Sequence, residues 1–119
     1  MKKTLVIGAS ENPSRYSYRA IQNLLDKQHA VVAIGQKGGK VNDITIQTKQ
    51  IPFKNIDTVT LYLNPIAQRG YYNYIIGLQP KRVIFNPGTE NPAFYPLLQS
   101  NGIEVEVACT LVLLATNQY

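Results

Sequence analysis

The stretch that decides the fold is Val6-Ile7-Gly8-Ala9-Ser10-Glu11-Asn12-Pro13-Ser14-Arg15-Tyr16-Ser17. A short apolar run ends at Gly8, small and turn-forming residues follow, and Arg15 stands just before a helical pattern. A glycine after a buried strand lets the chain turn tightly. The start of the next helix presents unpaired N–H groups and a partial positive charge. The pattern therefore predicts a strand, a phosphate-binding loop and a helix, in that order.

Short apolar runs alternate with helical patterns along the rest of the chain. We expect strands at residues 4–8, 30–35, 58–63, 82–85 and 103–107. The first helix begins between residues 14 and 17, and Ile21, Leu24 and Leu25 give it an apolar face. Such alternation favours a parallel sheet with crossover helices. Residues 1–119 are therefore predicted to form a single doubly wound α/β domain, with a mainly parallel sheet and helices on both faces.

Local signals place the other helix ends. Asn64-Pro65 and Asn91-Pro92 each combine an N-cap residue with a proline suited to the first helical position, and each predicts a helix start. Gly77 and Gly102 are the expected stops. Pro96 falls inside the second of these helices, so that helix starts late or is kinked. Residues 41–47 fit either a short strand pair or an excursion at the sheet edge.

Composition bounds the class of protein. The 119 residues, 45% of them apolar, suit one domain with an ordinary core. One cysteine excludes an internal disulfide framework, and one cysteine with one histidine disfavours a Cys/His metal site. No apolar run approaches the ~20 residues of a membrane span, and no signal-peptide core follows the first lysines. We therefore expect a soluble cytoplasmic protein with no membrane partner.

The positive charge lies mostly in the first half of the chain. The net charge is +5, and residues 1–54 carry nine Lys or Arg against three Asp or Glu. A basic half suits an anionic partner. A nucleic-acid partner is not expected, because the chain has no basic helix stripe, aromatic strand motif or zinc finger.

The first loop departs from the dinucleotide fingerprint G-x-G-x-x-G. Only Gly8 stands in it, and the predicted second strand ends in Gly35-Gln36-Lys37, where NAD enzymes carry an acid for the ribose hydroxyls. A lysine there favours a ribose that bears a phosphate. The ligands that fit are NADP and coenzyme A (CoA), and NAD is disfavoured.

Several segments together resemble the small, single-domain CoA-binding proteins of the Rossmann type, which are related to the CoA-binding domain of succinyl-CoA synthetase. The matching segments span nearly the whole chain: Gly8-Ala9-Ser10, Asn12-Pro13, Arg15-Tyr16-Ser17, Asn64-Pro65, Asn86-Pro87-Gly88-Thr89-Glu90-Asn91 and Cys109-Thr110-Leu111-Val112.

The resemblance implies that CoA or an acyl-CoA lies across the carboxyl ends of the strands. It places the phosphates on the first loop, with Gly8, Ala9, Ser10, Asn12 and Arg15, and it includes Tyr16 and Ser17, at the start of the helix that follows, among the cofactor-binding residues. It places the adenosine end on Gly35, Gln36 and Lys37, and the pantetheine arm on Leu63, Asn64 and Pro65. Tyr16 or Tyr18 would cover the ligand.

The residues favour binding over catalysis, without deciding the matter. His29, the only imidazole, is expected to act as a cation at the end of the first helix. Glu90 fits either a general acid–base or a helix-terminal charge. Cys109 is expected to be a small buried residue; a mixed disulfide with the CoA thiol is the alternative. The other functions that stay open are an NADP-dependent or CoA-dependent enzyme and an interaction subunit without ligand. Whether the chain forms a homodimer also stays open.

Overall fold

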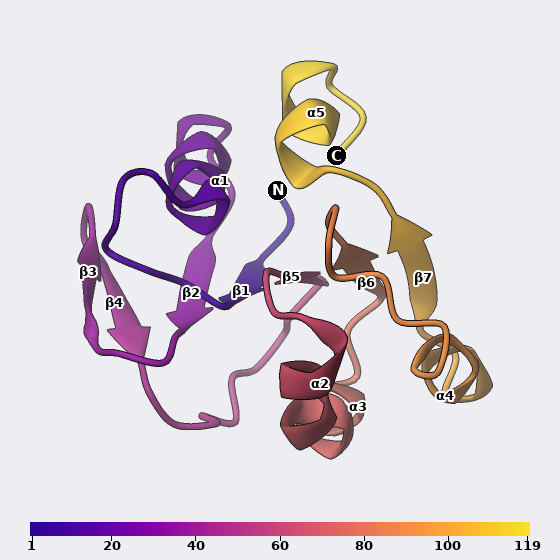
Figure 1. The fold of residues 1–119 in the computed structure, drawn as a ribbon. Helices are drawn as coiled ribbons and strands as arrows, with labels where there is room; N and C mark the ends of the chain where they lie inside the picture. Colours follow the sequence, from indigo (N-terminus) through magenta and orange to yellow (C-terminus); the bar gives the residue numbers. More distant parts are fainter.

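The computed structural model describes residues 1–119 and shows a sheet between two layers of helices (Figure 1). Seven strands form the sheet in the order β3-β4-β2-β1-β5-β6-β7. Their bounds are β1 Thr4–Ile7, β2 Val31–Ile34, β3 Gly39–Val41, β4 Ile44–Gln47, β5 Thr58–Leu61, β6 Arg82–Phe85 and β7 Glu104–Val107. All neighbouring pairs are parallel except β3 with β4. The predicted doubly wound α/β domain is confirmed.

The helices divide between the two faces of the sheet. Helices α1 (Tyr16–Asp26) and α5 (Thr110–Ala115) cover one face, and α2 (Pro65–Gln68), α3 (Tyr72–Leu78) and α4 (Tyr95–Ser100) cover the other, with a short 3-10 turn, η1 (Arg69–Tyr71), between α2 and α3 (Figure 1). None of these helices is long and apolar enough to cross a membrane.

Both faces of the central strands are buried, as parallel strands require. Leu5 and Ile7 of β1 join one apolar cluster with Ile75 of α3 and Phe94. Val6, which points to the other face, joins a second cluster with helix α1. This alternation explains why the sequence of a central strand reads as one continuous apolar run.

Residues 39–47 form a hairpin at one edge of the sheet. Strands β3 and β4 pair antiparallel, and β4 pairs parallel with β2. Asn42 at the two-residue turn has a positive φ of 52°, a conformation that asparagine tolerates and that short hairpin turns need. The strand-pair alternative for this segment is therefore correct.

The Asn64-Pro65 prediction is confirmed. The Asn64 side chain accepts a hydrogen bond from the Ala67 N–H at 2.8 Å, and Pro65 opens α2. Two other helix-boundary predictions are wrong. Gly77 lies inside α3, which ends one residue later with Gln79 in the left-handed conformation (φ 50°).

Asn91 does not cap a helix either. Its side-chain amide donates to Gln68 Oε1 and to the Tyr72 hydroxyl instead, and α4 begins only at Tyr95. The late start brings Pro96 into the first helical turn, where its missing N–H costs nothing. The late-start alternative for this helix is therefore correct.

Candidate functional site

The first loop (residues 8–15) leaves the carboxyl end of β1, beside the point between β1 and β5 where the strand order reverses, and runs past the end of β2. This reversal is where open α/β sheets form a ligand crevice. Gly8 has φ +96°, and a Cβ built on it would lie 2.6 Å from the Tyr62 carbonyl oxygen. Only glycine satisfies both the backbone angle and the close approach. The turn predicted from the sequence therefore needs glycine at residue 8, because the Tyr62 backbone lies so close to it.

Short-range hydrogen bonds organise the first loop. Asn12 N–H donates to Ser10 Oγ at 3.0 Å, and the N–H and hydroxyl of Ser14 donate to Asn12 Oδ1 at 3.0 and 2.8 Å. Arg15, the N-cap of α1, has no side-chain capping bond. These hydrogen bonds within the loop hold its conformation. No side chain accepts from the first N–H groups of α1, a three-turn helix.

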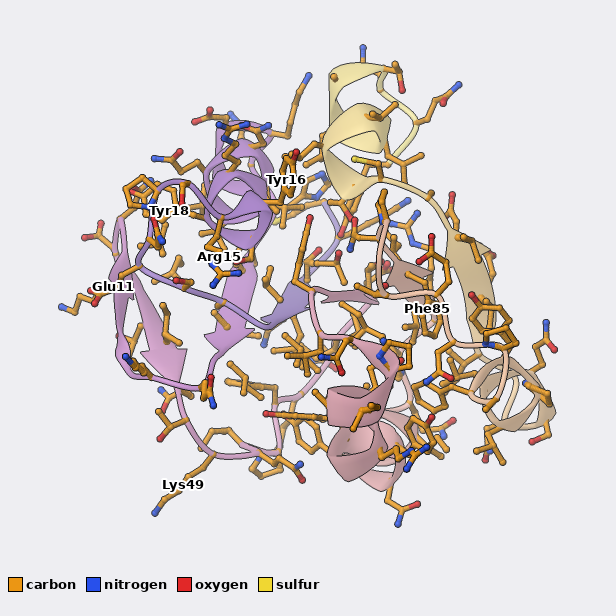
Figure 2. The ribbon with its side chains drawn as sticks, viewed as in Figure 1. Glu11, Arg15, Tyr16, Tyr18, Lys49 and Phe85 are labelled. Carbon is orange, nitrogen blue, oxygen red and sulfur yellow. The ribbon has the colours of Figure 1, made fainter.

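Arg15 and Lys37 are the cations beside the first loop. Both are exposed, both line the cavity, and neither takes part in the two ion pairs of the structure, Lys81–Asp57 and Arg82–Glu106. In Figure 2, Arg15 lies under the amino-terminal turn of α1. Unpaired cations beside an uncapped helix start favour an anionic ligand.

The opposite wall of the cavity is neutral and rests on a buried polar network. Gln68, fully buried, donates from its side-chain amide to the carbonyls of Leu63 and Thr89, both at 2.8 Å. Asn86 donates to Thr60 Oγ1 at 2.6 Å and to the Leu61 carbonyl at 2.9 Å, and its Oδ1 accepts from the Thr110 N–H at 2.9 Å. These bonds fix the loops that follow β5, β6 and β7 to one another.

Tyr62 also lines the cavity. Its hydroxyl is buried beside the Thr60 and Thr110 side chains, and burial raises its pKa to about 12. The hydroxyl is therefore protonated at neutral pH.

The walls enclose an open cavity of about 1060 Å³, large enough for a nucleotide-sized ligand. Eleven of the predicted site residues line it: Gly8, Ala9, Ser10, Asn12, Arg15, Tyr16, Ser17, Gln36, Lys37, Leu63 and Asn64.

Two predicted site residues, Gly35 and Pro65, lie outside the cavity lining. A Cβ on Gly35 would lie 2.3 Å from the Ala9 carbonyl oxygen, so this glycine makes room for the first loop. Pro65 opens α2 beside the capping residue Asn64. Both residues therefore position the cavity from outside it.

The sequence analysis did not place seven residues that line the cavity: Glu11, Ser14, Gly38, Tyr62, Pro87, Gly88 and Thr89. The last three belong to the Asn-Pro-Gly-Thr-Glu-Asn segment, whose match to the family was the available signal. Glu11 and Tyr62 carried no signal of their own in the sequence.

The candidate acid–base groups do not converge on the cavity. Glu90 lies outside its lining, and Glu90 Oε1 accepts from the Gly88 N–H at 2.8 Å. The interpretation of His29 as a helix-terminal cation is wrong. Its Nδ1 accepts from the Lys2 N–H at 2.8 Å, and burial together with nearby positive charges lowers its pKa. Cys109 is half-buried rather than buried, at the N-cap of α5.

Comparisons with known proteins show the family and the fold of this chain. Residues 2–115 match the family model of the CoA binding domain. The fold superposes on the crystal structure of an uncharacterized protein with a TM-score of 0.98 and 46% identity, covering 100% of this chain and 98% of that one.

Two further structures show the same fold. A protein from Thermus thermophilus matches with a TM-score of 0.85 and 21% identity, over 99% of this chain and 90% of its own. A hypothetical protein from Pyrococcus horikoshii matches with 0.83 and 26%, over 93% and 80%. No curated protein matches. With the family model covering almost its whole length, the chain belongs to the CoA-binding domain family.

Proposed function

We propose that this protein binds CoA or an acyl-CoA across the carboxyl ends of its strands and does so without catalysis. One observation carries the proposal. Two exposed cations, Arg15 and Lys37, have no ion-pair partner, and both line the same cavity as the uncapped start of α1. Family membership supports CoA as the anion that they meet.

The diphosphate is assigned to the first loop. Gly8 allows the close backbone approach, and the planar guanidinium of Arg15 can hold two phosphate oxygens at once. Ser10 and Asn12 use their side-chain oxygens within the loop. Their contribution to the ligand is therefore as donors, through the Ser10 hydroxyl hydrogen and the Asn12 amide.

The ribose phosphate is assigned to Lys37. This lysine and Gln36 follow β2, the position at which an NAD site would carry an acid. A compact ammonium group suits a terminal phosphate dianion. The neutral wall with Leu63, Asn64 and Thr89 then suits the uncharged pantetheine arm.

Two placements support binding without catalysis. Glu90 is engaged by the Gly88 N–H outside the cavity lining. His29 bonds Lys2 beside the amino ends of the strands, whereas the cavity lies at their carboxyl ends. His29 is therefore out of reach of a ligand bound in the cavity, and the Glu90 carboxylate already has a backbone partner.

The test is calorimetric titration with CoA, compared between the wild type, Arg15→Ala and Arg69→Ala. We expect Arg15→Ala to weaken binding at least about tenfold, because a charge-assisted contact with phosphate is lost. Arg69 is the control: it is an exposed arginine that lies outside the cavity lining. Equal affinity of Arg15→Ala and the wild type would refute the assigned role. Absence of CoA binding, or tighter binding of NADP, would refute the function.

A further inference from the structure

Glu11 ties the first loop to the edge hairpin. Its Oε2 accepts a hydrogen bond from the Lys40 N–H of β3 at 2.9 Å. In Figure 2, Glu11 lies beside β3, on the side of the molecule opposite Phe85. The two residues come from different elements, so the bond joins the first loop to the edge hairpin.

Gly39 makes this bond possible. A Cβ built on Gly39 would lie 2.1 Å from Cδ and 2.4 Å from Oε1 of Glu11, so any larger residue displaces the carboxylate. At the adjacent Gly38 the nearest heavy atom to such a Cβ is 3.7 Å away, an ordinary contact. The close fit is therefore specific to Gly39 and Glu11.

The corner that this bond fixes is residues 36–38, which carries Lys37. Before the corner, the N–H groups of Gly8 and Ala9 hold the first loop to the Ile34 carbonyl, both at 2.9 Å. After the corner, Glu11 holds the same loop to Lys40. The three corner residues are exposed. Their position relative to the first loop is set by these two ties together with the pairing of β4 with β2 and β3.

A carboxylate in the lining of an anion site works against the ligand's charge. Glu11 lines the cavity together with Arg15 and Lys37, and like charges at this range repel an anionic ligand. Any favourable effect of Glu11 on ligand binding must therefore come from how its bond to Lys40 positions the corner, and not from its charge. We propose that Glu11 is a positioning residue: it holds the corner so that Lys37 meets the phosphate on the ligand's ribose. This inference rests on the proposed CoA binding.

The test compares CoA with dephospho-CoA, which lacks the ribose phosphate, by calorimetry on four variants. Glu11→Ala removes the tie, and Gly39→Ala displaces the carboxylate while keeping its charge. Glu11→Gln removes the charge but keeps an oxygen that can accept from Lys40. Lys40→Ala is the control, because it keeps the backbone N–H and lies outside the cavity lining.

We expect Glu11→Ala and Gly39→Ala to lose about fivefold in CoA affinity, and to change dephospho-CoA affinity less than about twofold. The preference for CoA should stay near the wild-type value in Glu11→Gln and Lys40→Ala. Exchange of the Lys40 amide hydrogen, followed by NMR without ligand, should be faster in Glu11→Ala. If Gly39→Ala does not fold, the Glu11 variants carry the test alone.

Three results would overturn the inference. The first is an unchanged preference for CoA in folded Glu11→Ala. The second is tighter binding of both ligands in Glu11→Ala and Glu11→Gln alike, which would make the effect purely electrostatic. The third is a wild type that binds CoA and dephospho-CoA equally. These leave CoA binding itself intact, whereas a wild type that binds neither ligand would remove the proposed function as well.

Discussion

At the carboxyl ends of the strands, Arg15 and Lys37 line a cavity and have no ion-pair partner, whereas at the amino ends Arg82 is buried and ion-paired. Its guanidinium bonds Glu106 at 2.9 Å and lies 4.5 Å from the centre of the Tyr119 ring. A buried, ion-paired cation contributes to the stability of the folded domain, whereas exposed cations without a partner contribute little to it. We therefore assign the buried cation at the amino ends to stability and the exposed cations at the carboxyl ends to ligand binding.

The neutral wall of the cavity combines features of both ends, because its hydrogen bonds are buried and it lies beside the proposed ligand. Asn86→Ala tests it and should have the largest effect. The substitution removes three buried hydrogen bonds and leaves their partners, including the Thr110 N–H, unsatisfied. We expect a loss of about 4 kcal/mol in the free energy of unfolding, measured by urea denaturation.

Asn101→Ala is the control for Asn86→Ala. The Asn101 amide also makes a hydrogen bond, to the Leu97 carbonyl at 2.8 Å, but it is exposed. Its removal should cost below about 1 kcal/mol, since water replaces the lost partner. Equal losses in the two variants would show that burial of the Asn86 network contributes nothing.

Arg82→Met is the next largest change and tests the amino ends. It removes the buried guanidinium and leaves the Glu106 carboxylate without its partner. Because the Glu106 side chain is 31% exposed, water compensates in part, and we expect a loss of about 3 kcal/mol, at the lower end for such pairs. CoA affinity, measured by calorimetry in the folded variant, should not change.

Lys81→Met is the matched surface substitution. Lys81 precedes Arg82, its side chain is 84% exposed, and it lies 3.9 Å from Asp57. An exposed pair of this kind contributes at most about 0.5 kcal/mol. If Arg82→Met weakened CoA binding while remaining folded, the separation of stability and binding between the two ends would be incorrect.

How far the sequence predicts this molecule depends on the range of each interaction. The Gly8 turn and the Asn64 cap are local, and both were predicted. Asn91 carried the same local signal as Asn64, but its amide is taken by Gln68 and Tyr72, which lie elsewhere in the chain. A tertiary network therefore overrode a cap signature and moved the helix start.

The candidate site divides in the same way. The wall of the first loop was predicted because its residues are contiguous, and it forms its own hydrogen bonds. Glu11 was missed because its role arises only when β3 folds back and Gly39 leaves room for the carboxylate. Tyr62 was missed because its place in the lining and the burial of its hydroxyl depend on what packs around it.

The smallest expected effect is a pH dependence that belongs to the amino ends alone. Burial, and then positive charges that include Lys2 and Arg82, lower the pKa of His29 below its usual 6.5. Between the folded and the unfolded pKa, His29 is therefore protonated in the unfolded chain and neutral in the folded protein. The His29 contribution is complete above about pH 6.5 and declines as the pH falls from there to the folded pKa.

His29→Asn isolates this contribution, because the asparagine oxygen can replace Nδ1 as acceptor for the Lys2 N–H and does not titrate. Urea unfolding between about pH 5 and 8 should show a shallower loss of stability at low pH in His29→Asn than in the wild type. The difference should be the same with and without CoA, because His29 lies outside the cavity lining. A difference that appears only with CoA bound would show that the protonation of His29 is coupled to ligand binding. The amino ends, with Arg82, and the carboxyl ends, with Arg15, would then not act independently.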